Sequence, residues 1–363
     1  MKGQYYRLDR YILAKYIKTF LLALALIIVI IITFDVSEKL DRLISHHATF
    51  WQVVFDYYGN FIPGFVNLYS PLFIFISVLF FTSKMAGNTE VIAILGSGIS
   101  YRRMLRPYLY GSSIVALVVL VLGNFVLPIS NRNLMEFEDK YIKSNSTNYY
   151  NNIHFQSERG VQVYANTYDA VRRDVLLFQR DVFDGGLLKS RETANFISYD
   201  TVTHDWICND YVVRHIEPGG NEGYTYETAV HKELGLEPED FDLLSQDITT
   251  MNTPALIKHI KREKFRGTGI VKEAQIELWQ RLLNPIAIIV MTFIGVAIAA
   301  RKSRGGIGLH LAMGITIAFA FIVFMKITTV FATNGDLSPF MAVLLPQLIF
   351  GIAAGVLIYK APK

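Results

Sequence analysis

Four basic residues lie in or beside long apolar stretches, where a positive charge finds few favourable surroundings. Lys39 and Arg42 follow the first stretch and share a helical face, because they lie three residues apart. Arg281 stands two residues after Trp279 near the start of the fourth stretch, and Lys326 lies inside the fifth. A charge at such depth is costly unless it reaches a cavity, a partner or the interface. The four cations predict a basic ring that binds a phosphorylated or anionic lipid headgroup; ordinary anchoring at the membrane interface is the alternative.

An acidic residue, Glu90, leads a short apolar segment in a loop that is otherwise basic. Gly96, Ser97 and Gly98 end this segment, which predicts a short helix on the inner face of the membrane. Two roles fit the carboxylate. It can stabilise the positive end of the helix dipole, or it can dock a cytoplasmic partner together with Ser97 and Gly98.

Residue types that carry catalysis or bind metals show no productive spacing in this sequence. The histidines do not follow metal-ligand spacing, and the HExxH, GxSxG and GxxxxGK[ST] patterns do not occur. Cys208 is the only cysteine and cannot form an internal disulfide bond. We therefore expect a protein that is not an enzyme and that binds neither a cofactor nor a metal.

The composition of the chain indicates that membrane-spanning helices position the basic and acidic residues described above. Apolar residues make up 52% of the 363 residues and charged residues 18%, against about 25% charged in a typical soluble protein. The apolar residues fall in blocks of about 20, long enough to cross a bilayer as helices. Six spans are predicted, at roughly Ala14–Val36, Phe61–Phe81, Pro107–Leu127, Ile276–Ala300, Gly308–Phe331 and Pro339–Tyr359. This pattern excludes a soluble globular enzyme, a disordered chain and a disulfide-stabilised scaffold.

The distribution of charge predicts the orientation of the spans. Residues 131–270 hold 16 basic and 22 acidic residues, and the rest of the chain holds 19 and 9. The basic excess lies beside the spans and does not indicate a nucleic-acid partner. Fourteen Lys and Arg residues flank the spans on the side of the two termini, and two flank them on the other side. The positive-inside rule therefore predicts that both termini are cytoplasmic and that the long segment between the third and fourth spans lies outside.

That long segment has the alternating pattern of β-strands. Strands are expected at residues 161–165, 175–183, 194–199, 206–213 and 224–230, with glycine-rich turns between them and an amphipathic helix over 254–266. The expected fold is an α-helical membrane protein with six transmembrane helices, three before and three after an inserted all-β, jelly-roll-like domain. The domains expected are residues 1–130 with a short cytoplasmic helix near 89–98, which corresponds to a coupling helix if the chain is similar to the family named below, residues 131–270, and residues 271–363.

Several short segments, in this order and spacing, resemble the LptF/LptG permease family. They are Leu8-Asp9-Arg10-Tyr11-Ile12 before the first span, Glu90 to Gly98, Trp279-x-Arg281-x-x-x-Pro285, and Arg304-Gly-Gly-x-Gly308. The amino-terminal segment resembles the LptG type. The arrangement of three plus three spans around a β-rich domain is also similar, so the resemblance covers nearly the whole chain.

The resemblance implies a permease subunit of the lipopolysaccharide-export ABC transporter in the bacterial inner membrane. The implied partners are a dimer of a cytoplasmic ABC ATPase, a homologous second permease, a single-span accessory protein with its own periplasmic jelly roll, and lipopolysaccharide. ATP hydrolysis then belongs to the partner. The alternative is a membrane-anchored sensor or scaffold with a periplasmic binding domain, which would not need six spans. An intramembrane enzyme would need a convergent catalytic cluster, and the sequence does not indicate one.

Overall fold

A computed structural model describes residues 2–142, 149–217, 220–238, 240–241, 248–300 and 306–360. The chain divides into two compact units. The helical unit comprises Met1–Lys143, Thr249–Thr253 and Gln275–Lys363, and the β unit comprises Ser144–Ile248 and Pro254–Ala274. Residues 304 and 305 of the glycine-rich segment quoted above lie outside the described residues.

Six helical segments of the described chain are long and apolar enough to cross a membrane, which confirms the six predicted spans. They are Arg7–Ser45, Phe50–Gly87, Tyr101–Tyr141, Ile270–Ala299, Gly308–Asn334 and Pro339–Tyr359. Their elements are α1 (Lys2–Ser45), α2 (Phe50–Gln52), η1 (Val53–Tyr58), α3 (Gly59–Gly87), α4 (Glu90–Gly96), α5 (Tyr101–Met104), α6 (Arg106–Val121), η2 (Leu122–Val126), α7 (Leu127–Tyr141), α10 (Ile270–Ala299), α11 (Gly306–Asn334) and α12 (Pro339–Tyr359). Most of these segments extend beyond the apolar blocks, because polar residues at their ends continue the helices.

Helix α3 packs closely against α10 and α11. A Cβ at Gly314 of α11 would overlap the side chain of Leu79, and one at Gly295 of α10 would press on Phe75. Small residues permit such close approach between membrane helices. The Ser83 hydroxyl also lies 2.7 Å from Nδ1 of His310 across the α3–α11 contact. Glycines and a buried hydrogen bond thus fix the helices that surround the candidate site.

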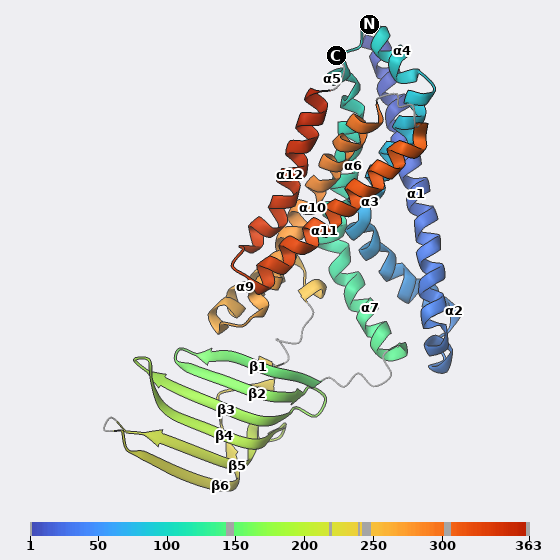
Figure 1. The fold of residues 1–363 in the computed structure, drawn as a ribbon. Coiled ribbons are helices and arrows are strands. Elements are labelled where there is room, and N and C mark those ends of the chain that lie inside the picture. The colour runs from blue at the N-terminus through green and yellow to red at the C-terminus, as the bar shows by residue number, and fades with distance from the viewer. Residues whose placement is uncertain are drawn as a thin grey trace. The chain divides into compact units, whose positions relative to one another are not determined.

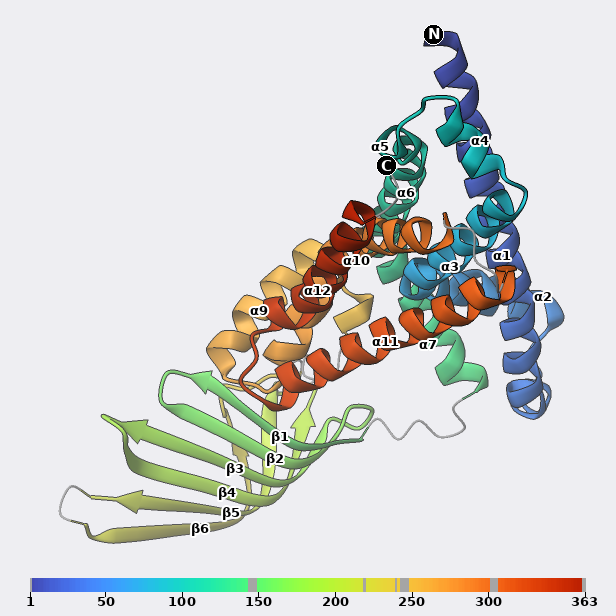
Figure 2. The same ribbon diagram turned by 45° about the horizontal axis from the view of Figure 1, so that its top comes forward.

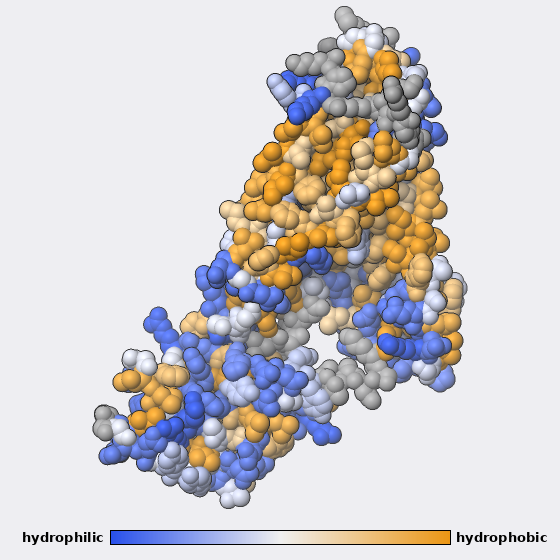
Figure 3. Space-filling view, in the orientation of Figure 1, coloured by the Kyte–Doolittle hydropathy of each residue, from blue (hydrophilic) through white to orange (hydrophobic). Residues whose placement is uncertain are grey.

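The two ends of the helical unit differ. Both chain termini lie at the end that carries α4 and α5, here called the termini end (Figure 1). Helix α2 and the turn between α11 and α12 lie at the opposite end, here called the far end, as the turned view also shows (Figure 2). Apolar side chains cover the middle of the unit, and hydrophilic ones gather toward its ends (Figure 3). This is the surface expected of a protein that spans a bilayer.

The β unit contains one antiparallel sheet of six described strands. These are β1 (Tyr149–Glu158), β2 (Val161–Asp169), β3 (Asp174–Asp184), β4 (Leu187–Asp200), β5 (Asp205–Ile216) and β6 (Glu222–Lys232). The inserted β domain is thereby confirmed. Its described strands lie in the order β1-β2-β3-β4-β5-β6, which is a meander, whereas a complete jelly roll contains two Greek keys. Strand β1 precedes the first strand expected from the sequence, at residues 161–165, and was not predicted.

The apolar face of the sheet is covered in part by residues 234–238 and 240–241. Phe241 is fully buried and its ring lies 5.1 Å from that of Tyr168. The indole of Trp206 donates a hydrogen bond of 2.8 Å to the Leu236 carbonyl. Cys208 is buried in the same core, and burial raises the pKa of its thiol to about 12. The single cysteine is therefore an unreactive core residue.

The predicted amphipathic helix forms as α9 (Thr253–Arg266), after the short turn η3 (Ile248–Thr250). Within the β unit the Arg266 guanidinium forms an ion pair with Asp240 and lies 5.2 Å from the centre of the Phe155 ring. Arg266 thus joins the end of α9 to the segment that covers the sheet. Gly267, with a φ of 69°, follows and ends the helix.

Candidate functional site

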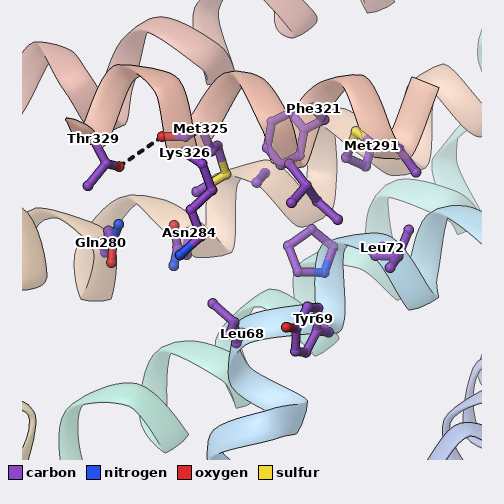
Figure 4. Close-up of a pocket in the computed structure, with 14 residues that line it drawn as sticks. Leu68, Tyr69, Leu72, Gln280, Asn284, Met291, Phe321, Met325, Lys326 and Thr329 are labelled. Carbon is purple, nitrogen blue, oxygen red and sulfur yellow. Dashed lines mark hydrogen bonds between the residues drawn. The ribbon is translucent and has the colours of Figure 1, made fainter. Parts of the chain in front are cut away.

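A cavity of about 140 Å³ opens inside the helical unit between α3, α10 and α11. Its lining residues recur at helical spacing, so that each helix contributes one face. They are Leu68, Tyr69, Pro71, Leu72, Gln280, Asn284, Ala287, Met291, Ala318, Phe321, Ile322, Met325, Lys326 and Thr329. Gln280, Asn284, Lys326 and Thr329 gather toward one side of the cavity, and apolar residues such as Met291 and Leu72 gather toward the other (Figure 4). The cavity is therefore amphipathic.

Lys326 supplies the positive charge of this cavity. Its side chain points across the cavity toward Asn284 (Figure 4). The Oδ1 atom of Asn284 is buried without a hydrogen-bond partner among the described residues. The neighbouring Thr329 hydroxyl donates to the Met325 carbonyl at 2.8 Å. A cation and an amide thus face a space that apolar residues continue, which suits the polar end of an amphiphile.

The Arg281 side chain binds a carboxylate and backbone carbonyls of the same chain. The side chain is 3% exposed, and its guanidinium donates to Glu277 at 2.8 Å and to the carbonyls of Met251 at 2.7 Å and Thr249 at 3.2 Å. Asn131 of α7 donates to the same Thr249 carbonyl at 3.2 Å. Arg281 therefore fastens the segment before the fourth span to the helices on either side of it.

Lys39 belongs to a cluster of partly buried polar groups near the far end of α1. Its ammonium lies 2.8 Å from Asp35, 3.9 Å from Glu138 of α7, and in hydrogen-bond contact with the Tyr57 hydroxyl. The Tyr58 hydroxyl donates to Asp35 at 3.0 Å. Lys39 is 20% exposed. The sequence contained part of this signal, since Asp35 and Lys39 are four residues apart on one helix.

Arg42 differs from Lys39, because its side chain is exposed. The structure does not gather the four predicted cations into one cluster. Lys39 and Arg42 lie on α1, whereas Arg281 and Lys326 lie on α10 and α11. The far ends of α1 and α11 stand on opposite sides of the helical unit in both ribbon views (Figures 1 and 2). A ring of these four residues within one chain is therefore not formed.

At the termini end, Glu90 connects α4 to α1. Its carboxylate accepts hydrogen bonds from the Tyr11 hydroxyl at 2.8 Å and from the Lys15 ammonium at 3.0 and 3.3 Å. A second link joins α5 to α1, where Arg103 donates twice to Asp9, both at 2.7 Å. Neither link was predicted from the sequence, because the partners lie 75 to 94 residues apart along the chain.

The carboxylate of Glu90 stays ionised in these surroundings. Burial opposes its ionisation, but the hydrogen bonds from Tyr11 and Lys15 and the charge of Lys15 outweigh that effect, so the pKa of Glu90 lies below its ordinary value. The side chain keeps 28% exposure. Glu90 is thus engaged within its own chain and still reachable from solvent.

The outward face of α4 is small and apolar. Ile92, Ala93, Gly96 and Ser97 are exposed, whereas Val91 is buried. Residue 96 lies four residues after 92 and three after 93, so that the three share one side of the helix. A face of this kind fits a groove in another protein, because it presents few bulky or charged groups at its centre.

No group of three or more metal-ligating side chains occurs among the described residues.

These features define a class: a polytopic helical membrane protein with a β domain inserted between its third and fourth spans and an amphipathic cavity among its helices. The model of the family described as lipopolysaccharide export system permease LptF/LptG matches residues 10–360. The chain belongs to this family. No curated protein matches the sequence. The family includes both LptF and LptG, so the LptG-like assignment made from the amino terminus stays a prediction.

Membership of the LptF/LptG family shows the general role and the location of the chain. The chain is a permease subunit of lipopolysaccharide export and a multi-pass protein of the inner membrane, and it belongs to the membrane subunits of a transporter, which are not enzymes themselves. The family implies an export ABC transporter with partner subunits.

Proposed function

We propose that this permease extracts lipopolysaccharide from the inner membrane as one half of an ABC transporter and passes it to a periplasmic jelly-roll bridge. A homologous permease pairs with it, a dimer of cytoplasmic ATPases binds beneath both, and a single-span accessory protein with its own jelly roll continues the path. Both termini are cytoplasmic in this proposal. Support comes from the basic excess on the side of the termini and from the common end at which both termini lie (Figure 1).

The observation that carries this proposal is the attachment of α4 to α1. The exposed face of α4 at Ile92, Ala93 and Gly96 fits a docking contact with the ATPase. Glu90 binds Tyr11 and Lys15 of α1 behind that face. A displacement of α4 by the ATPase would therefore be carried to the first span. Ser97 and Gly98, which end the segment, are also exposed and complete the docking surface.

The four cations take two different roles in this proposal. Arg42, which is exposed, and Lys326, which lines the cavity, are placed to meet phosphate groups of the glycolipid. Lys39 and Arg281 already bind carboxylates of their own chain. These two act as positioning residues that hold α1 against α7 and the 249–251 segment against α10.

Reconstitution tests the proposal. The permease is placed in proteoliposomes with a candidate ATPase and a second permease, and release of a lipid A-containing glycolipid to a soluble jelly-roll acceptor is measured. We expect release that requires ATP and all subunits. Failure of the ATPase to co-purify, together with glycolipid binding that never leads to ATP-dependent release, would favour a sensor or scaffold instead.

Lys326→Leu is expected to keep the fold and to reduce ATP-dependent glycolipid release by about tenfold or more. Removing a charge from a membrane span costs the folded protein little, whereas an ammonium–phosphate contact contributes about 1.5–3 kcal/mol. Lys326→Arg should retain most of the release. Thr329→Val, another change in the cavity lining that removes no charge, serves as the matched control. Full release by Lys326→Leu, with an unchanged thermal melt, would assign the lysine to interfacial anchoring.

A further inference from the structure

Helix α9 of the β unit exposes a stripe that the export mechanism does not use. The stripe consists of Ile257, Lys258, Lys261, Lys264 and Phe265, whose spacing places them on one side of the helix. Ile257 is 40% exposed and Phe265 53% exposed. The opposite side carries the buried residues Leu256, His259, Ile260 and Glu263. An apolar side chain thus stands at each end of a row of three exposed lysines.

Basic residues are concentrated in α9, whereas acidic residues predominate in the rest of residues 131–270. Helix α9 holds five basic residues and one acidic residue, whereas the remainder of residues 131–270 holds 11 basic and 21 acidic residues. The lysines of the stripe form none of the described ion pairs, although Arg262 and Arg266 of the same helix do. A positive stripe in an otherwise acidic segment favours an anionic partner.

The chain connection brings the carboxyl end of α9 close to a membrane surface. Helix α9 ends at Arg266 and α10 begins at Ile270. The apolar part of α10 starts near Ile276, six residues or about 9 Å along the helix. A headgroup layer is about 5–8 Å thick on each side of the hydrocarbon core. The first residue of α10 therefore lies near the outer edge of that layer, and α9 ends four residues before it.

We propose that the Ile257–Phe265 stripe of α9 docks on the anionic headgroups of the leaflet from which the fourth span emerges. Amphipathic helices bind such surfaces by inserting apolar side chains between headgroups while lysines meet their phosphates. Each lysine near an anionic surface favours binding about fivefold, so three lysines favour it about 100-fold. The docking goes beyond the export function, since it needs neither the ATPase nor lipopolysaccharide.

The test places a probe on the stripe of the full-length protein. Ile257→Cys is labelled with an environment-sensitive maleimide dye in nanodiscs of phosphatidylcholine alone or with phosphatidylglycerol added. The native Cys208 is buried and its thiol pKa is raised, so it stays unlabelled. Val202→Cys, at an 85% exposed turn between β4 and β5, is the reference position. We expect a blue shift at position 257 only in discs that contain phosphatidylglycerol, and none at position 202.

Two triple variants, each of which removes three positive charges, distinguish docking of the stripe from a general effect of net charge. Lys258→Gln, Lys261→Gln and Lys264→Gln together should lower the ratio of docked to exposed dye by about 100-fold at a fixed phosphatidylglycerol content. Arg159→Gln, Arg172→Gln and Lys189→Gln together remove the same charge from exposed positions elsewhere in the unit and should leave that ratio unchanged. About 1 M NaCl, which shortens the Debye length to about 3 Å, should also release the stripe of the protein with unaltered lysines.

Three results would overturn the proposal. They are equal emission in the two kinds of nanodisc, equal loss of the shift in both triple variants, and a shift that survives high salt. The salt experiment needs no lysine substitution and decides the matter even if the first triple variant fails to fold.

Discussion

Lys39→Glu is expected to lower the free energy of unfolding of the helical unit by about 3 kcal/mol or more. The ammonium of Lys39 lies between Asp35 and Glu138. A glutamate in its place would put three carboxylates together in a partly buried site. Removing one partner of a buried ion pair already costs about 3–5 kcal/mol, because the remaining charge loses its compensation. Unfolding of the purified protein by heat or by denaturing detergent measures the effect.

Two further variants isolate the cause. Arg42→Glu makes the same change of charge at an exposed position three residues away, and we expect it to alter stability by less than about 0.5 kcal/mol. Lys39→Met removes the cation without adding a carboxylate and should fall between the other two. Equal stability of Lys39→Glu and Arg42→Glu would show that the Asp35–Lys39 pair contributes nothing. The glycolipid contact at this end of α1 is best tested with Arg42→Glu alone, because a double variant would confuse unfolding with loss of binding.

Glu90→Lys is expected to reduce recovery of the ATPase with the permease by well over tenfold, and Glu90→Ala by about tenfold. Charge-assisted hydrogen bonds of this kind contribute about 1.5–3 kcal/mol, and each 1.4 kcal/mol corresponds to a factor of ten. The lysine variant adds repulsion from Lys15. Pull-down of the ATPase, alongside a thermal melt of the permease, is the measurement. Tyr359→Lys, which adds a positive charge at an exposed site on the termini end, is the control.

Lys15 distinguishes two ways in which Glu90 can act. If the carboxylate holds α4 in place through α1, Lys15→Ala should reproduce the loss, and Glu90→Lys combined with Lys15→Glu should restore recovery. If it binds an arginine of the ATPase directly, Lys15→Ala should leave recovery unchanged. Normal recovery with both Glu90→Ala and Glu90→Lys would reduce Glu90 to a residue that stabilises the start of α4.

The link between Glu90 and α1 should depend on pH in one direction. A carboxyl whose pKa is lowered in the folded state contributes stability above its ordinary pKa, and that stability is lost as the pH falls through the lowered value. ATPase recovery is therefore expected to be constant between about pH 6 and pH 8. Weakening should appear only in strongly acidic buffer.

The sequence predicted the spans and the inserted β domain because both depend on local patterns. An apolar block of about 20 residues has few alternatives to a membrane helix. Alternating residues in 161–165 and its successors indicated strands in the same way. Strand β1 was missed because the adjacent polar residues Asn151 and Asn152 interrupt its pattern, which leaves only the short alternating run from Ile153 to Gln156.

The candidate site was only partly predictable, since it depends on contacts between distant residues. The cation inside the fifth span was evident from composition, but the cavity that Lys326 lines is made by three helices whose packing no local pattern reports. The partners of Glu90 and Arg281 likewise come from other segments. A charge in an apolar stretch therefore predicts that a partner exists, whereas identifying the partner requires the tertiary structure.

The consecutive order of the six strands has a consequence for biogenesis. Every described strand pairs with its neighbour in the sequence, so the sheet is built from hairpins with short loop closures. Such local pairings form quickly once their residues are available. The helical unit, in contrast, needs residues after Gln275 to pack against helices made before Lys143. During synthesis from the amino terminus, we expect the sheet and the segment that covers it to assemble while the last three spans are still being made, so that the apolar face of the sheet is covered during the interval.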